Sequence, residues 1–324
     1  MLKTFSNTLY ELYESADSTE LSTFPAAAIR LVGKLVSFDG AVLGTGESSA
    51  PGPDKLVIHK AFVHGRDPEI LADYAKVAMV DPMTNKFAGG LSEPLASSFS
   101  DIEPGEPFDE LRAFYKRHRL QHLLLFGDPG GDENPARWLV LYRSAGEAFN
   151  AQASQLMASI WPHLVRCLSI NRLLFLQRQF PQHQHIGVAL VSPIGRIDAA
   201  EPLFKKLCAL EWPASTGKKI PDVVCRSWRR GLDYVGTRVK FKLQLQCDGF
   251  IVGQASLVGP LDHLTPAERI VANRFAGGSS AKVIANELGI SVHTVRSQLA
   301  HVYEKLNIHD KAELANYLIA DSTF

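Results

Sequence analysis

The sequence predicts an α+β fold, with antiparallel sheets flanked by helices up to residue 258 and a separate all-helical unit of four helices after it. Three observations lead to this prediction. Short apolar runs bounded by turn residues recur through the first 258 residues, as expected of half-buried strands. One long helical stretch occupies residues 151–180. The last sixty or so residues hold four short segments, each with its own helix start signal.

Length and composition limit the class of protein. The chain has 324 residues, 46% of them hydrophobic, so we expect a globular protein of two or three domains. No apolar run is long enough to cross a membrane, and residues 1–6 contain no secretory core, so we expect a cytoplasmic protein without membrane contact. The cysteines are scattered and form no Cys-x-x-Cys pair, which argues against a metal site.

Residues 1–180 alternate predicted helices and strands. Helices are expected at residues 24–36 and 68–79. Strands are expected at residues 39–46, 55–62, 122–126 and 138–143. This alternation predicts an antiparallel sheet flanked by helices.

A ligand enclosed by this sheet would contact mainly aromatic side chains, with one or two polar groups to orient it. Aromatic residues on alternating strand positions are also what an ordinary sheet core needs, so the prediction concerns the group and not any single residue. The candidate ligand-binding residues are Phe38, Phe62, Tyr74, Asp81, Phe126, Trp138 and Tyr142.

The helical stretch 151–180 carries apolar residues in steps of four, at Leu156, Ile160, Leu164 and Leu168. Such a stripe suits either dimerisation or packing on the helix's own domain, and the sequence leaves both open. Pro162 is expected to break or kink the first turns, because proline removes a helical hydrogen bond.

Residues 181–185 are interpreted as a linker, and a third segment covers residues 186–258. A strand at 187–192 precedes a helix that begins at Pro202, and strands at 239–245 and 250–255 flank a hairpin turn. The segment shows no flavin-attaching cysteine motif and no evident haem ligand, so we expect a relay or dimer module without a cofactor.

The C-terminal residues contain the local signals of helix, tight turn and helix. Thr265 is an N-cap with Pro266 at the first helical position and Glu268 completing a capping box. Ser279 or Ser280 starts a second helix, which Gly289 ends. Asp310 and Glu313 are expected to cap a fourth helix.

Ser291 starts a third helix, whose apolar stripe packs on the first two helices. The opposite face is therefore free to enter a DNA groove, with the N-terminal positions nearest the base edges. The candidate DNA-binding residues on this face are His293, Thr294, Arg296, Ser297, Ala300 and His301.

Together these segments resemble the LuxR-type (GerE-like) helix-turn-helix of bacterial transcription regulators. The resemblance rests on Leu264-Thr265-Pro266-Ala267-Glu268, Lys282-Val283-Ile284-Ala285, Leu288-Gly289-Ile290-Ser291, Thr294-Val295-Arg296 and Tyr303-Glu304-Lys305-Leu306-Asn307-Ile308. It implies that residues 261–324 bind double-stranded DNA, that Lys282 contacts phosphate, that Arg296, Ser297 and Ala300 lie over base edges or backbone, and that the fourth helix pairs two subunits. The chain departs from the family pattern at Gln298 and Ala300.

The preceding segments have weaker resemblances. Residues 1–180 resemble GAF-like sensory domains, and the opening of residues 186–258 resembles a PAS domain. Tyr74 followed by Asp81-Pro82 is similar to the lactone-binding receptors of the LuxR family, in which an Asp takes the ligand amide, although the expected Trp is missing. These resemblances imply sensory domains ahead of the DNA-binding unit.

The charge balance limits how the protein would bind DNA. Lys and Arg number 34, equal to the 34 Asp and Glu, and residues 261–320 contain six of each sign. Nonspecific attraction to phosphate is therefore modest, and useful affinity requires two copies on a two-fold site together with directed contacts such as Arg296.

The leading hypothesis is a homodimeric DNA-binding transcription regulator, not an enzyme, whose N-terminal domains sense a small molecule or another signal. RNA polymerase is a further candidate partner. Two alternatives remain open. One is an enzyme with a catalytic N-terminal domain and a regulatory DNA-binding C-terminus, for which the sequence offers no catalytic motif. The other is an acyl-homoserine lactone receptor of the quorum-sensing type.

Overall fold

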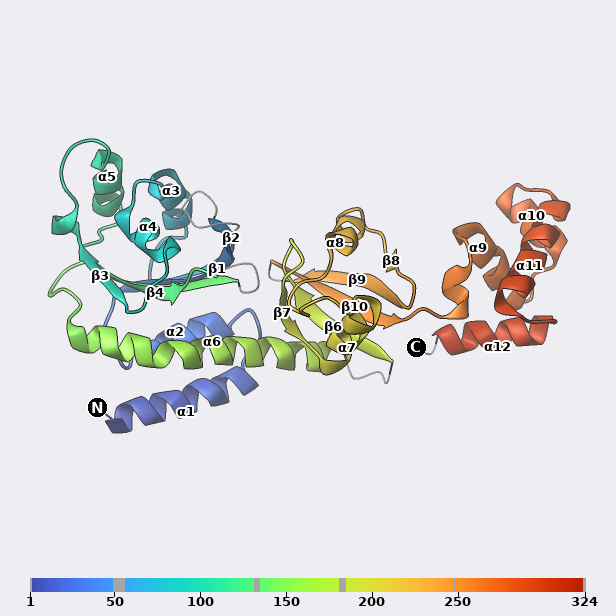
Figure 1. The fold of residues 1–324 in the computed structure, drawn as a ribbon, viewed down its shortest axis with the longest axis horizontal. Helices are drawn as coiled ribbons and strands as arrows, with labels where there is room; N and C mark the ends of the chain where they lie inside the picture. Colours follow the sequence, from blue (N-terminus) through green and yellow to red (C-terminus); the bar gives the residue numbers. More distant parts are fainter. Residues whose placement is uncertain (1, 49–55, 131–134, 181–184, 248, 323–324) are drawn as a thin grey trace.

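The computed structural model describes residues 2–48, 56–130, 135–180, 185–247 and 249–322. It contains two antiparallel five-stranded sheets followed by a helical C-terminal unit, which confirms the α+β prediction (Figure 1). The predicted linker falls mostly on residues 181–184, which lie outside the described residues.

The first sheet has the strand order β2-β1-β5-β4-β3. Its strands are β1 (Gly40–Ser48), β2 (Leu56–His64), β3 (Leu95–Ser98), β4 (His122–Asp128) and β5 (Ala136–Arg143). Helices α1 (Leu2–Ser18), α2 (Phe24–Val32) and α6 (Ala151–Gln179) cover one face, and α3 (Glu69–Val77), α4 (Pro82–Ala88) and α5 (Asp109–Arg117) cover the other (Figure 1). A 3₁₀ turn, η2 (Phe99–Asp101), follows β3. Both faces of this sheet are therefore buried.

The second sheet repeats the same relative order, as β7-β6-β10-β9-β8. Its strands are β6 (Ile186–Val191), β7 (Ile197–Ala200), β8 (Tyr234–Val235), β9 (Val239–Cys247) and β10 (Phe250–Leu257), with α7 (Pro202–Glu211) and α8 (Asp222–Arg229) on one face. That face is filled by large aromatic side chains, including Phe204, Trp228 and Phe241.

The long helix α6 joins the two sheets. Ile160, Leu164 and Leu168 of its predicted stripe are buried in the core of the first sheet, and Leu176 is buried against the second. These residues pack within their own chain, which is one of the two roles that the sequence left open. The predicted break at Pro162 is wrong, because α6 continues through this residue as one helix. Buried neighbours such as Trp161 hold this part of the helix in place.

The C-terminal unit contains η3 (Pro260–His263), α9 (Pro266–Ala276), α10 (Ala281–Leu288), α11 (Val292–Leu306) and α12 (Lys311–Ser322). The predicted starts of these helices are confirmed. Thr265 and Glu268 form a reciprocal capping box, and Ser280 and Ser291 each accept from a backbone N–H of the following helix. Asp310 accepts from the Glu313 N–H at 2.8 Å, at the start of α12.

Candidate functional site

Helix α11 presents one continuous polar face to solvent. Val295, Leu299, Val302 and Leu306 are buried against the other helices. His293, Arg296, Ser297, Ala300 and His301 are all exposed. Because these positions recur at helical spacings of three and four, they lie along one side of the helix. The structure thus brings the predicted residues of this helix together on one surface.

Two of the candidate residues also make contacts inside the unit. The Thr294 hydroxyl lies 2.8 Å from that of the N-cap Ser291, so Thr294 contributes to the start of the helix. His301 Nδ1 lies 3.9 Å from the Glu268 carboxylate, which also accepts from Lys305 at 2.7 Å. Burial alone would raise the pKa of Glu268, but hydrogen bonds from Lys305 and from Thr265 of the capping box lower it.

Three exposed cations of the C-terminal unit have no acidic partner among the described residues. They are Lys282 on α10, Arg296 on α11 and Lys311 on α12, of which Lys311 lies over the Phe275 ring. By contrast, Arg274 pairs with Glu287, and Lys305 pairs with Glu268. Lys282 and Arg296 are therefore the basic groups of α10 and α11 that remain available for an anionic partner.

The first sheet and helices α3, α4 and α5 enclose a cavity of about 420 Å³. Of the seven candidate ligand-binding residues, Tyr74, Asp81, Trp138 and Tyr142 line this cavity. Phe38, Phe62 and Phe126 pack instead on the opposite face of the sheet, against the core that includes α2 and α6. The alternation of side chains along a strand separates the two groups.

The main polar cluster of the cavity is centred on Asp81. Its carboxylate accepts from the Tyr74 hydroxyl at 2.5 Å and from the Met83 backbone N–H at 2.9 Å, which makes Asp81 the N-cap of α4. The Tyr74 oxygen also lies 2.5 Å from the Thr84 hydroxyl. Asp81 is only 3% exposed, and burial raises its pKa. A buried carboxylate of this kind favours a ligand that donates a hydrogen bond to it.

Sequence reasoning missed much of the cavity wall. Met83 and Phe87 come from α4 and Phe114 from α5, two short helices that were not predicted. The signal for α4 was present, because Asp81-Pro82 is an N-cap followed by proline at the first helical position.

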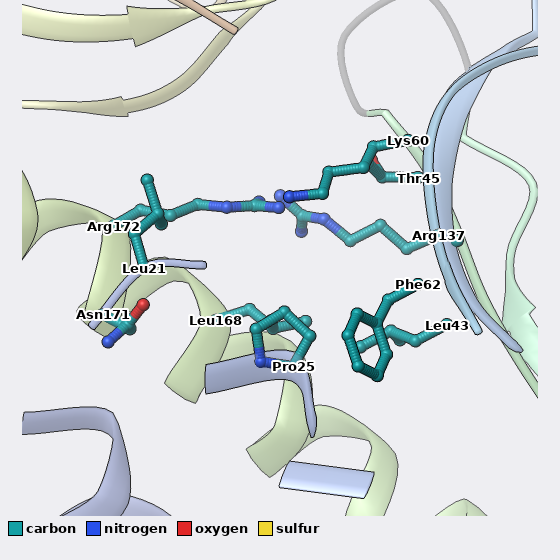
Figure 2. Close-up of a pocket in the computed structure, with 11 residues that line it drawn as sticks. Leu21, Pro25, Leu43, Thr45, Lys60, Phe62, Arg137, Leu168, Asn171 and Arg172 are labelled. Carbon is teal, nitrogen blue, oxygen red and sulfur yellow. The ribbon is translucent and has the colours of Figure 1, made fainter. Parts of the chain in front are cut away.

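The other face of the first sheet carries a charged junction with the second sheet. Arg137 of β5 and Arg172 of α6 both pair with Asp198 of β7, at 3.2 Å and 2.6 Å. Figure 2 shows the Arg137, Arg172 and Lys60 side chains converging above an apolar slot that includes Phe62. The slot measures about 40 Å³, enough for a few water molecules but too small for the ligands that the larger cavity would hold.

A second junction links the second sheet to the C-terminal unit. Lys240 of β9 lies 3.0 Å from the carboxylate of Asp262 in η3, and Arg269 of α9 lies 3.9 Å from it. Within the described ranges, the structure contains no group of His, Cys, Asp and Glu arranged to hold a metal ion. No described helix is both long and apolar enough to cross a membrane.

Comparison with known proteins places the C-terminal unit. The family model described as bacterial regulatory proteins, luxR family, matches residues 262–318. The transcriptional regulatory protein UhpA of Salmonella typhimurium is 45% identical over 58 residues, which are 18% of this chain and 30% of UhpA. GfsR of Streptomyces halstedii, named as a probable HTH-type transcriptional regulator, is 34% identical over 65 residues, 20% of this chain and 27% of GfsR. The match thus spans less than a third of the length of these curated relatives.

Two solved structures are similar to larger parts of the chain. SdiA of Escherichia coli aligns over 98% of this chain and 97% of its own, with 14% identity and a TM-score of 0.38. CepR2 of Burkholderia cenocepacia, an N-acylhomoserine lactone dependent LuxR-family transcription factor, aligns over 55% of this chain and 99% of its own, with 14% identity and a TM-score of 0.35. From the capped helices, the exposed face of α11 and the family match, residues 262–318 are a helix-turn-helix domain of the LuxR family of bacterial regulatory proteins.

Proposed function

We propose that the protein is a DNA-binding transcription regulator that acts as a homodimer and whose affinity for DNA is controlled by a small molecule bound in the first domain. The observation that carries the DNA-binding part is the exposed face of α11, with Arg296 unpaired by any described acidic group, in a domain of the LuxR family. A regulator that binds bacterial DNA would act in the cytoplasm, where that DNA lies. The named relatives are regulators, so we propose no catalytic role.

The ligand-binding part rests on the cavity of the first sheet. Its volume of about 420 Å³ falls in the range of small-molecule sites, and its walls are mostly apolar with a few polar groups such as Asp81. The route from cavity to DNA would run through the shared helix α6 and the aspartates of the two junctions, Asp198 and Asp262. A ligand that binds one arrangement of these parts better than another would shift the population between them.

An acyl-homoserine lactone receptor is a second candidate function. It is favoured by the buried carboxylate of Asp81, which accepts from Tyr74 and Met83 and retains capacity for one more N–H donor. A lactone amide would supply that donor.

The homodimer is proposed because a two-fold DNA site offers one half-site to each of two helix-turn-helix units. A helix-turn-helix unit with so few free cations needs two copies on a two-fold DNA site to reach useful affinity. By the family resemblance α12 would pair the subunits, and Tyr317 of that helix is 37% exposed and free to enter such a contact.

Native mass spectrometry of the purified full-length protein tests subunit count and ligand retention together. We expect a dimer that carries the extra mass of a small molecule, released on denaturation. A monomer at micromolar concentration would contradict the two-site model of DNA binding. A dimer without added mass after refolding from denaturant serves as the ligand-free reference for DNA-binding assays.

The dependence of DNA affinity on salt is a separate prediction. Each subunit offers Lys282 and Arg296, so a dimer would neutralise about four phosphates and log K should fall with log salt at a slope of about −3 to −4. Fluorescence anisotropy of a labelled duplex across a salt series measures this slope. A slope near twice that size would mean that the paired cations of the unit also reach the backbone.

A further inference from the structure

Trp138 forms a flat floor to the cavity of the first sheet. It lies on β5 between two glycines at the same register, Gly44 on β1 and Gly127 on β4. A Cβ atom at Gly44 would lie only 2.1 Å from Cε2 and Cζ2 of Trp138, so the indole rests directly on the backbone of β1. A strand glycine commonly marks such a close approach.

A second ring lies over the neighbouring strand. A Cβ atom at Gly127 would lie 3.0 Å from the Phe87 ring, which meets the Trp138 ring at a centroid distance of 6.1 Å and an angle of 69°. The two rings make a corner, with the indole as the floor and Phe87 as a wall. Tyr74, Phe114 and Tyr142 add aromatic surface from α3, α5 and β5.

Two hydrogen-bond donors on this surface have no partner among the described residues. They are Nε1 of Trp138 and the hydroxyl of Tyr142, and both residues line the cavity. Burial holds Tyr142 in its protonated form by raising its pKa. A ligand with hydrogen-bond acceptors would supply partners for these two donors.

We propose that the cavity takes a planar heteroaromatic ligand, stacked on Trp138, with a ring N–H donated to Asp81 and a carbonyl oxygen that accepts from Tyr142 or Trp138. This inference rests on the proposed role of the cavity as the ligand site. A flat ring matches an indole floor and an edge-on phenyl wall, because aromatic pairs favour stacked and T-shaped arrangements. A saturated acyl chain would gain nothing specific from this corner.

Quinolin-4(1H)-one is the test probe, because its fused ring carries both an N–H and a carbonyl. Isothermal titration calorimetry on the full-length protein would compare it with 1-methylquinolin-4-one, which lacks the donor, and with N-octanoyl-homoserine lactone, which lacks the aromatic ring. We expect the quinolone to bind and the methylated analogue to bind more than about tenfold more weakly, since it has no N–H to donate to the Asp81 carboxylate.

Three variants test whether the quinolone binds at the corner formed by the Trp138 and Phe87 rings. Trp138→Leu is expected to weaken the quinolone by about tenfold, and Tyr142→Phe, which changes only a hydroxyl, by about threefold to tenfold. Gly44→Ala is expected to abolish stacking because its methyl group takes the place of the indole. Phe126→Leu is the matched control, since Phe126 lies on the opposite face of the same sheet and should leave the affinity unchanged.

The affinity of the quinolone is also expected to depend on pH. Asp81 faces Tyr74 of α3, Thr84 of α4, Tyr115 of α5 and Tyr142 of β5, and its pKa is raised by burial. A donated N–H favours the ionised carboxylate, so affinity is highest above the raised pKa and falls as pH drops through it. The methylated analogue, and the Asp81→Asn variant, should lose this dependence.

The outcomes separate this inference from the proposed function. Strong binding of the lactone with none of the quinolone would overturn the planar-ligand inference while supporting a ligand sensor. Binding of neither probe would overturn it as well, and so would quinolone affinity that Tyr142→Phe and Trp138→Leu leave unchanged. Failure of the protein to bind any duplex would overturn the proposed function without touching the cavity.

Discussion

Replacing Asp198 with asparagine is expected to lower the free energy of unfolding by about 3–5 kcal/mol. Asp198 is the shared partner of Arg137 and Arg172, and only 4% of its side chain is exposed. Without its charge, two guanidinium groups would face each other at a site largely removed from water. Burial lowers the pKa of Arg172, and the Asp198 carboxylate raises it. Asp198 therefore offsets part of the cost of burying the guanidinium charge.

Urea unfolding of the variant, followed by circular dichroism and by tryptophan fluorescence, measures the loss. The matched control is Asp17→Asn, because Asp17 pairs with Arg178 at 3.5 Å while 72% of its side chain is exposed. An exposed pair contributes little, so the control should stay within about 0.5 kcal/mol of the parent. Equal effects of the two substitutions would contradict the view that the junction is a buried ionic contact.

Neutralising the whole junction sharpens the same test. The triple variant Asp198→Leu, Arg137→Met and Arg172→Met removes the three charges of this ion-pair cluster together, so it is expected to recover most of the stability lost in the single variant. A triple variant as unstable as Asp198→Asn would point to lost packing as the cause. Arg172 also lies over the Phe250 ring at 4.8 Å, a contact that methionine partly replaces.

The C-terminal unit was predictable because its signals are local. Thr265, Ser280 and Ser291 each cap the helix that follows within three residues, and Gly289 takes the left-handed conformation that ends α10. Such signals need no knowledge of the rest of the fold. They placed all four helices of the unit and the exposed face of α11.

The cavity was only partly predictable because both faces of the first sheet are covered by helices. Alternation along β4 and β5 separates Phe126 from Trp138, but it does not say which face holds the cavity. Asp81 was predicted as a ligand-binding residue. Its second role, as the N-cap of α4, was not predicted because the helix itself was not predicted. The contact between Arg137 and Asp198 joins residues 61 apart, so no local pattern reveals it.

Replacing Arg296 with alanine is expected to have the largest effect on DNA binding. In a dimer both copies change, so a loss of about 1–3 kcal/mol per contact becomes about 2–6 kcal/mol, which is about 30-fold or more in affinity. The preference at one base position of each half-site should relax as well, because Arg reads guanine edges by paired hydrogen bonds. Arg296 is exposed near the start of α11, where recognition helices meet base edges.

Lys282→Ala is the matched comparison, since Lys282 is also exposed and unpaired with any described acidic group but is expected to contact phosphate. It should weaken all duplexes alike and by less, and reduce the salt slope by about one per subunit. Anisotropy titrations of both variants against a selected site and its single-base variants distinguish the two roles. If Arg296→Ala left affinity and base preference unchanged while Lys282→Ala weakened binding, α11 would lie along the phosphate backbone and not in the major groove.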